Sequence, residues 1–175
     1  YFYMPDKLKT AIRDIQDFPK EGIIFKDITP ILANPALLQR SIELLVETAK
    51  DQKIDKVVGI DARGFIFASP IALALGAGFV PVRKAGKLPW KTHSASYTLE
   101  YGENIVEIHQ DAIQPGEKVL LVDDLLATGG TAAAAVSLLE KLGADIVSVS
   151  FLIELSFLDG RNKINHSNIN SIITY

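Results

Sequence analysis

Short, unbroken apolar runs that alternate with helical stretches are the feature that most limits what this chain can fold into. Strands without polar alternation, separated by helices, predict a parallel sheet that is covered by helices on both faces. The sequence therefore predicts an α/β fold with a central, mostly parallel sheet flanked by helices. We expect buried strands at Lys56–Ile60, Phe79–Val82, Val119–Val122 and Ile146–Ile153, and helices at Gly64–Leu75 and Gly130–Leu142.

Other segments carry weaker local signals. Apolar residues at helical spacing predict an amphipathic first helix over Pro5–Gln16. The breaker-bounded segment Gly22–Pro30 is expected to be extended or looped, and Asn34–Pro35 to open a second helix. Residues Ser94–His109 combine strand formers with a break at 101–103, which predicts a hairpin or a long flap.

Composition excludes several classes of protein. The chain has 175 residues, which suits one domain, with 48% hydrophobic and 22% charged residues, as in ordinary globular proteins. A formal net charge of −3 gives no general drive toward nucleic acid or an anionic membrane, and no apolar run approaches the roughly 18 residues of a membrane span. Cysteine is absent, which excludes disulfides and fits a cytoplasmic protein.

The chain start does not read as a signal peptide, because no basic flank precedes an apolar core. We expect Met4 to be the initiator methionine and residues 1–3 to be a remnant of the expression vector. A single domain over residues 4–175 is therefore predicted.

The most informative segment follows the apolar run Val119–Val122, where Asp123 and Asp124 precede a turn rich in glycine and a helix. In open α/β sheets ligands bind at the carboxyl ends of strands, and a turn entering a helix presents backbone N–H groups to an anion. Thr128 and Thr131 can add hydroxyl donors. The alternative is an ordinary strand–turn–helix in which aspartate caps the helix. The spacing matches neither a Walker A loop nor a Rossmann fingerprint.

The 13 residues VLLVDDLLATGGT closely resemble the motif that binds 5-phosphoribosyl 1-pyrophosphate (PRPP) in type I phosphoribosyltransferases, in the form typical of the adenine-specific members. The resemblance implies that Asp123 and Asp124 face the ribose hydroxyls. It also implies that the turn wraps the 5′-phosphate through Ala127, Thr128, Gly129, Gly130 and Thr131.

Three further segments resemble the same family in the same order, so the likeness covers most of the chain. GIIFKDITP, residues 22–30, is similar to the base-binding stretch. The resemblance implies that Phe25 stacks on adenine while the backbone of Ile24 and Lys26 reads its edge, and that Leu155 covers the other face. Taken without the family, Phe25 is more simply interpreted as a core residue.

The loop GIDARGF, residues 59–65, resembles the pyrophosphate loop, and Arg63 would contact the leaving group or the base. An arginine here could equally serve as a capping or ion-pair residue. The resemblance also assigns Arg83, Lys84 and Lys87 to the PRPP phosphates, partly across a dimer interface. By itself such a basic cluster is more often a solvated loop.

SYTLEYG, residues 96–102, is similar to the catalytic flap, which we expect at about residues 84–108. Glu100 would manage the proton at a ring nitrogen of the purine, and Tyr101 would help to close over PRPP. The alternative is that Glu100 is a surface carboxylate in a hairpin. A flap is chemically useful because an oxocarbenium-like sugar must be shielded from water.

The resemblance as a whole implies a type I phosphoribosyltransferase fold with a flexible flap and a small hood over the base. The implied reaction transfers the phosphoribosyl group of PRPP to adenine and gives AMP and pyrophosphate. Mg²⁺ would be bound mainly through PRPP, near Asp123 and Asp124. The protein would be a homodimer. A phosphoribosyltransferase for another base, or a PRPP-binding regulator without catalysis, are the alternatives.

Overall fold

The computed structural model describes residues 5–99 and 102–175. Its main sheet contains the strands β3 (Lys56–Ile60), β4 (Gly78–Lys84), β5 (Thr92–Leu99), β6 (Gly102–His109), β7 (Lys118–Leu126), β8 (Asp145–Glu154) and β9 (Ile169–Thr174). Their order is β5-β6-β4-β3-β7-β8-β9. The five strands from β4 to β9 in that order are parallel, and the hairpin β5–β6 joins the β4 edge antiparallel. The predicted mostly parallel sheet is confirmed.

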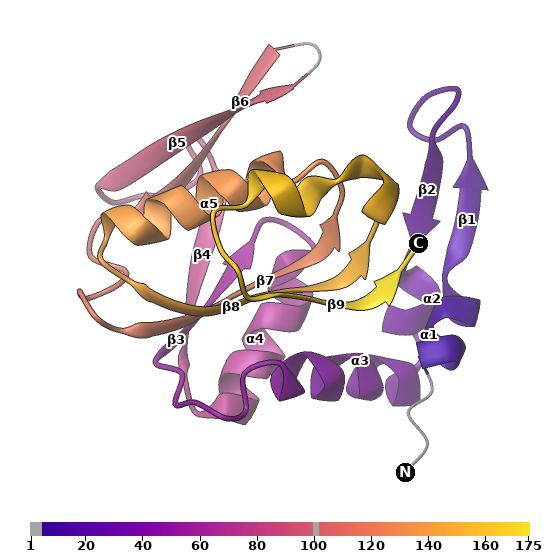
Figure 1. The fold of residues 1–175 in the computed structure, drawn as a ribbon, viewed down its shortest axis with the longest axis horizontal. Coiled ribbons are helices and arrows are strands. Elements are labelled where there is room, and N and C mark those ends of the chain that lie inside the picture. The colour runs from indigo at the N-terminus through magenta and orange to yellow at the C-terminus, as the bar shows by residue number, and fades with distance from the viewer. Residues whose placement is uncertain (1–4, 100–101) are drawn as a thin grey trace.

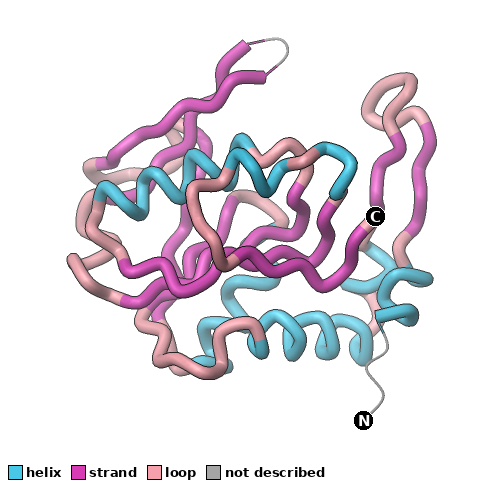
Figure 2. The backbone as a smooth tube through the Cα atoms, in the orientation of Figure 1, coloured by secondary structure: helices cyan, strands magenta, loops and turns pink. Residues whose placement is uncertain are grey.

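Helices cover both faces of this sheet (Figure 1). The α-helices are α1 (Pro5–Ala11), α2 (Thr29–Leu32), α3 (Pro35–Glu47), α4 (Gly64–Leu75) and α5 (Gly130–Lys141), and the 3-10 helices are η1 (Ser156–Leu158) and η2 (Gly160–Lys163). Helix α5 lies on one face and α3 and α4 lie on the other (Figures 1 and 2). No helix within the described ranges is long and apolar enough to cross a membrane.

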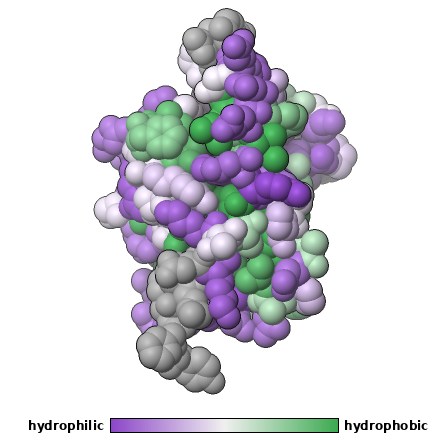
Figure 3. Space-filling model, turned by 90° about the vertical axis from the view of Figure 1, so that its right-hand side faces the viewer, coloured by the Kyte–Doolittle hydropathy of each residue, from purple (hydrophilic) through white to green (hydrophobic). Residues whose placement is uncertain are grey.

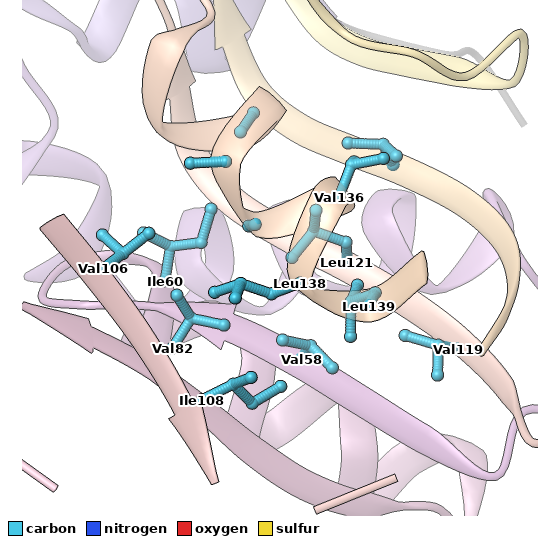
Figure 4. Packing of buried hydrophobic residues seen from close by; sticks show 14 of the residues in the cluster. Val58, Ile60, Val82, Val106, Ile108, Val119, Leu121, Val136, Leu138 and Leu139 are labelled. Carbon is cyan, nitrogen blue, oxygen red and sulfur yellow. The ribbon is translucent and has the colours of Figure 1, made fainter. Parts of the chain in front are cut away.

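Alternation along the central strands divides the core into two layers. Val119 and Leu121 of β7 pack toward α5, whereas Leu120 and Val122 belong to the cluster under α3 and α4. Figure 4 shows Leu138 of α5 among the side chains of the first layer. A parallel strand buried on both faces has no solvent side, which is why these strands carry continuous apolar runs.

The predicted first helix is wrong in its second half. Helix α1 ends at Ala11, and Arg13–Gln16 forms β1, which pairs antiparallel with β2 (Ile24–Asp27). Tertiary pairing overrides the helical period here, because Ile15 lies opposite Phe25 and an ion pair of 2.9 Å joins Arg13 to Asp27. This hairpin stands apart from the main sheet in Figure 1 and is called the hood below.

The other local predictions are largely confirmed. Asn34 caps α3, because its side-chain oxygen accepts hydrogen bonds from two backbone N–H groups of the first turn. The strand at β3 and the helix α4 have the predicted bounds, and β5 and β6 form the predicted hairpin. Strand β9 was not predicted, and β7 runs four residues beyond the predicted end at Val122, to Leu126.

Candidate functional site

A cavity of about 520 Å³ opens at the carboxyl ends of β3, β4 and β7. This is the edge at which parallel α/β sheets bind ligands. Its lining combines basic, acidic and small residues from separate segments. The chemically relevant ones are Asp61, Arg63, Arg83, Lys84, Tyr97, Asp123, Asp124, Ala127, Thr128, Gly129, Gly130 and Thr131.

Part of the cavity lining is formed by the turn 127–131 and the start of α5. Gly129 is the N-cap residue, with φ of 88°, and no side chain caps the helix there. The first turn of α5 also carries no acidic residue. Backbone N–H groups at such a helix start lack intrahelical partners and attract an anion. The interpretation of Asp123 or Asp124 as a cap of α5 is therefore wrong.

The two adjacent aspartates, Asp123 and Asp124, line the same cavity as this turn and the basic residues. Strand β7 continues its pairing with β8 to Leu126, but its pairing with β3 stops at Val122. The carboxylates thus follow the point where β7 stops pairing with β3. Oδ1 of Asp123 accepts the backbone N–H of Asp124 at 2.8 Å. Burial, and next the charge of Asp124, raise the pKa of Asp123 well above its ordinary value.

Arg63 connects the aspartate pair to the hood. Its Nε lies 2.7 Å from Oδ2 of Asp124, which is buried, and its side chain does not cap α4. Its guanidinium carbon lies 5.2 Å from the centroid of the Phe25 ring. Of the two simple alternatives for Arg63, the structure supports the ion pair and contradicts the cap.

Phe25 is half-buried in the hood and is not a residue of the core. Its ring meets that of Phe18 edge-on, with centroids 5.2 Å apart, and Phe18 is half exposed. The hood thus presents an aromatic surface beside Arg63. Figure 3 views the molecule from this side, where apolar residues reach the surface between more hydrophilic ones. The simpler interpretation of Phe25 as a core residue is wrong, while its contact with a base stays a prediction.

The basic cluster at the end of β4 and in the turn that follows lies only partly in the cavity. Arg83 and Lys84 line it, and Nε of Arg83 pairs with Oδ2 of Asp61 at 3.0 Å. Lys87 lies outside the lining. Glu107 fixes the turn that lies between Lys84 and Lys87. Its carboxylate accepts hydrogen bonds from the backbone N–H of Gly86 and the hydroxyl of Thr92, each at 2.8 Å. These bonds, that of Gly86 first, lower the pKa of Glu107.

The remaining predicted residues lie away from this cavity or outside the described ranges. Nζ of Lys26 pairs with Asp14 at 2.8 Å and lies 3.9 Å from the centroid of the Tyr175 ring, which leaves only the Lys26 backbone for a ligand. The backbone N–H of Leu155 donates to the carbonyl of Leu126 at 2.9 Å, so Leu155 stands at the same edge of the sheet. Ile24 is exposed on the hood. Glu100 and Tyr101 lie outside the described residues.

Two residues of the lining with polar side chains, Asp61 and Tyr97, were not assigned a role from the sequence. Tyr97 of β5 lies against the start of α5, where a Cβ added to Gly130 would be 3.0 Å from its ring. Asp61 holds Arg83. Asp61 could have been found from the sequence, because it is the first polar residue after a buried strand, where ligands bind in α/β sheets. Tyr97 could not, because only the folding of the hairpin over α5 brings it to the cavity.

An ion pair between the exposed Arg161 and the buried Glu154 holds the segment that follows β8. Nε of Arg161 reaches both carboxylate oxygens of Glu154, at 2.9 and 2.8 Å, and the hydroxyl of Ser171 donates to the same carboxylate at 2.7 Å. Arg161 first, and Ser171 in addition, lower the pKa of Glu154. The carboxylate therefore stabilises the fold above its ordinary pKa of 4.5, and this contribution is lost as the pH falls through the lowered value.

Arg161→Ala is expected to lower the free energy of unfolding at neutral pH by about 1–3 kcal/mol, because a buried carboxylate loses its partner. The difference from the wild type should shrink as the pH falls below the pKa of Glu154. Denaturant unfolding from pH 7 to pH 3 measures this. Lys163→Ala, which removes an exposed charge of the same 3-10 helix, is the control, and an equal loss at every pH would contradict the assignment.

Comparison with known proteins agrees with this geometry. The family model of the phosphoribosyl transferase domain matches residues 27–168. The adenine phosphoribosyltransferase of Anaeromyxobacter dehalogenans is 54% identical over 172 residues, which covers 98% of this chain and 100% of the relative.

Two solved structures share the whole fold. The adenine phosphoribosyltransferase of Thermoanaerobacter pseudethanolicus has a TM-score of 0.94 at 50% identity, over 98% of this chain and 99% of the other. The Saccharomyces cerevisiae enzyme, complexed with D-2,5-dideoxy-2,5-imino-altritol 1,6-bisphosphate and adenine, has a TM-score of 0.91 at 46% identity, over 96% and 97%. The chain therefore belongs to the phosphoribosyl transferase domain family, and within it to the adenine phosphoribosyltransferases.

Proposed function

We propose that the protein transfers the 5-phosphoribosyl group of PRPP to adenine and releases AMP and pyrophosphate. The observation that carries this proposal is the arrangement of the cavity. An uncapped helix start, three basic side chains and a pair of adjacent carboxylates line the same cavity. A sugar that carries a phosphate and a pyrophosphate matches this combination of charges.

The turn 127–131 would bind the 5′-phosphate of PRPP through its backbone N–H groups and the hydroxyls of Thr128 and Thr131. Asp123 and Asp124 would accept hydrogen bonds from the ribose 2′- and 3′-hydroxyls. Such bonds favour the charged form of the carboxylate, so ribose binding should lower the raised pKa of Asp123.

The pyrophosphate would lie against Arg63, Arg83 and Lys84, with Lys87 approaching from the exposed turn. Arg63 and Arg83 are each already paired with an aspartate, which orients their guanidinium groups before the substrate arrives. A preoriented donor need not reorganise as charge develops on the leaving group.

Adenine would stack on Phe25 of the hood, with Leu155 on its other face. Strand β2 pairs only with β1 among the described strands, so alternate backbone groups of β2 remain free to read the edge of a base. Ile24 and Lys26 would supply these groups. Directed backbone donors and acceptors distinguish adenine from guanine or hypoxanthine, which stacking alone cannot do.

In the proposed reaction the bond between C1 of the ribose and the pyrophosphate oxygen breaks, and its electron pair leaves with pyrophosphate. N9 of adenine forms the new bond to C1, and the proton released by the imidazole ring of adenine passes to Glu100. Tyr101 helps the flap close. Exclusion of water protects the oxocarbenium-like sugar from hydrolysis. These two flap roles rest on the family resemblance.

Mg²⁺ fits this site only as a partner of the substrate. Asp124 is already paired with Arg63, and in residues 5–99 and 102–175 no three His, Asp or Glu side chains form a metal site. Asp123 and Asp124 would therefore lie near an ion that takes most of its ligands from PRPP and water. When bound, Mg²⁺ would neutralise charge on the pyrophosphate.

A homodimer is the proposed assembly, and helix α4 supports it. This helix contains no charged residue, and Ile66 and Leu73, seven positions apart, lie on one face and are 39% and 85% exposed. Phe79 of β4 is also exposed and meets Phe65 edge-on. A helix that is apolar all round is ordinarily buried, so a second copy of this chain is the expected cover.

Leu73→Glu is expected to shift the protein from dimer toward monomer in sedimentation velocity, because a charge would be buried in the interface. Ala36→Glu adds the same charge at the exposed start of α3 and should leave the dimer intact. A wild-type protein that is monomeric at every concentration would contradict the proposed assembly.

We also infer a cytoplasmic protein that acts on small molecules and has no nucleic acid partner. The 175 residues contain no cysteine, and the formal net charge is −3. Both features support the inference, since disulfides mark oxidising compartments and a basic balance marks nucleic-acid binding.

The test of the proposed function is product formation from PRPP and Mg²⁺ with adenine, hypoxanthine, guanine, xanthine and uracil in parallel. AMP and pyrophosphate from adenine alone is the expected result. Product with another base would keep the PRPP site but overturn the assignment of the hood. PRPP binding without product from any base would favour a regulator over an enzyme.

A further inference from the structure

The segment after β8 packs directly against the turn that would hold the 5′-phosphate. The contact is made by two glycines, Gly160 at the start of η2 and Gly129 in the turn. A Cβ added to Gly160 would overlap the carbonyl oxygen of Ala127 and lie 3.2 Å from the backbone nitrogen of Gly129. A Cβ added to Gly129 would in turn overlap the carbonyl oxygen of Gly160. The two backbones are therefore as close as glycine alone permits.

Gly160 is needed for this closeness and not for backbone geometry. It is absent from the glycines with positive φ, whereas Gly129 has φ of 88°. Alanine can therefore adopt the backbone conformation of Gly160, and only its methyl group would be out of place. Gly160 is also buried, so that methyl group could not turn toward solvent.

Fixed anchors on both sides hold Gly160 against the turn. Next to it, Arg161 is paired with the buried Glu154 and also donates from Nη1 to the carbonyl of Ile169 at 2.9 Å. Before it, the N–H of Leu155 donates to the carbonyl of Leu126, directly ahead of the turn. The segment is thus tied to β7, β8 and β9 and cannot retreat when the turn is pushed.

We propose that Gly160 is a positioning residue for the 5′-phosphate subsite. Its backbone packs against the turn 127–131 and thereby fixes the direction in which the N–H groups of that turn point. The proposal rests on the proposed function, because it assumes that this turn binds the phosphate of PRPP. It predicts an effect confined to one of the two phosphate subsites, since Arg83 and Lys84 lie on β4, away from the contact between Gly160 and the turn.

The test compares two minimal ligands, ribose 5-phosphate and magnesium pyrophosphate, by titration calorimetry. Gly160→Ala is expected to weaken ribose 5-phosphate about tenfold or more, because a displacement of about 1 Å can cost up to about 100-fold. Pyrophosphate affinity should not change, and KM should rise for PRPP but not for adenine. Gly78→Ala is the matched control, because its Cβ would meet only the flexible side chain of Lys56 as close contacts, at 3.1 Å.

A second variant covers the case in which Gly160→Ala does not fold. Arg161→Ala loosens the segment without adding an atom to the contact and should also weaken ribose 5-phosphate selectively. Equal loss of both ligands, or no loss of either in the folded variants, would overturn the proposal. A wild-type protein that binds neither ligand would instead contradict the proposed function.

Discussion

Asp123→Asn combined with Asp124→Asn is expected to lower kcat/KM for PRPP by about 10²–10⁴-fold. Each carboxylate would accept a hydrogen bond from a ribose hydroxyl, and a bond to a charged group contributes about 1.5–3 kcal/mol, where about 1.4 kcal/mol is a factor of ten. Steady-state kinetics with saturating adenine measure the change. Asp145→Asn, at the opposite end of β8, is the control for a lost carboxylate. Unchanged turnover in the double variant would show that the ribose site is wrongly assigned.

The single variant Asp123→Asn should separate binding from stability. Because burial and Asp124 raise the pKa of Asp123, ionising it costs the folded state free energy as the pH rises above the ordinary value of 3.8. Asparagine removes that cost, so the variant should have a higher Tm than the wild type at neutral pH. The difference should vanish at acid pH, where Asp123 is protonated in both states. Higher stability with lost activity would identify a residue kept for its chemistry.

Arg63→Ala is expected to lower kcat by about 10²–10³-fold, the usual effect of removing one preoriented group that stabilises developing charge. The guanidinium pairs with Asp124 and lies over the Phe25 ring, so it stands between the proposed ribose and base sites. Arg63→Lys keeps the charge but not the planar donor fork, and we expect it to recover only part of the rate.

Arg40→Ala is the matched control for this prediction, since Arg40 forms an exposed pair with Glu43 on α3. A control with full activity and a wild-type Tm in the Arg63 variants would exclude a loss of folded protein. If Arg63→Ala instead kept kcat and raised only KM for adenine, Arg63 would serve the base and not the leaving group.

Local hydrophobic patterns were sufficient to predict the elements whose tertiary packing agrees with their local preference for helix or strand. The run Val119–Val122 is apolar at every position, and helix α4 is apolar between two strands, so burial agrees with local preference. The secondary-structure predictions fail where pairing with a strand distant in the sequence decides the local conformation. Ile15 has helical spacing from Leu8 and Ile12 but pairs with Phe25, and β9 becomes a strand because it completes the sheet beside β8.

The residues of the candidate site also fall into those that local sequence predicted and those that only the fold brought together. The turn 127–131 is contiguous, so its composition identified it without knowledge of the fold. Arg63 and Asp124 are far apart in the chain, and only the parallel pairing of β3 with β7 brings them to 2.7 Å. No local signal marks Gly160, because the requirement for glycine arises from a backbone that approaches from another segment.

The sequence by itself determined the α/β class, the turn that we propose to bind the phosphate, and the family, because each depends on contiguous residues whose chemistry is local. The tertiary structure alone decided the pairing of β1 with β2, the pairing of Arg63 with Asp124 and of Arg83 with Asp61, and the contact of Gly160 with Gly129. The physical reason is that strand pairing and packing join residues with no fixed separation along the chain, so their distances exist only once the sheet has formed.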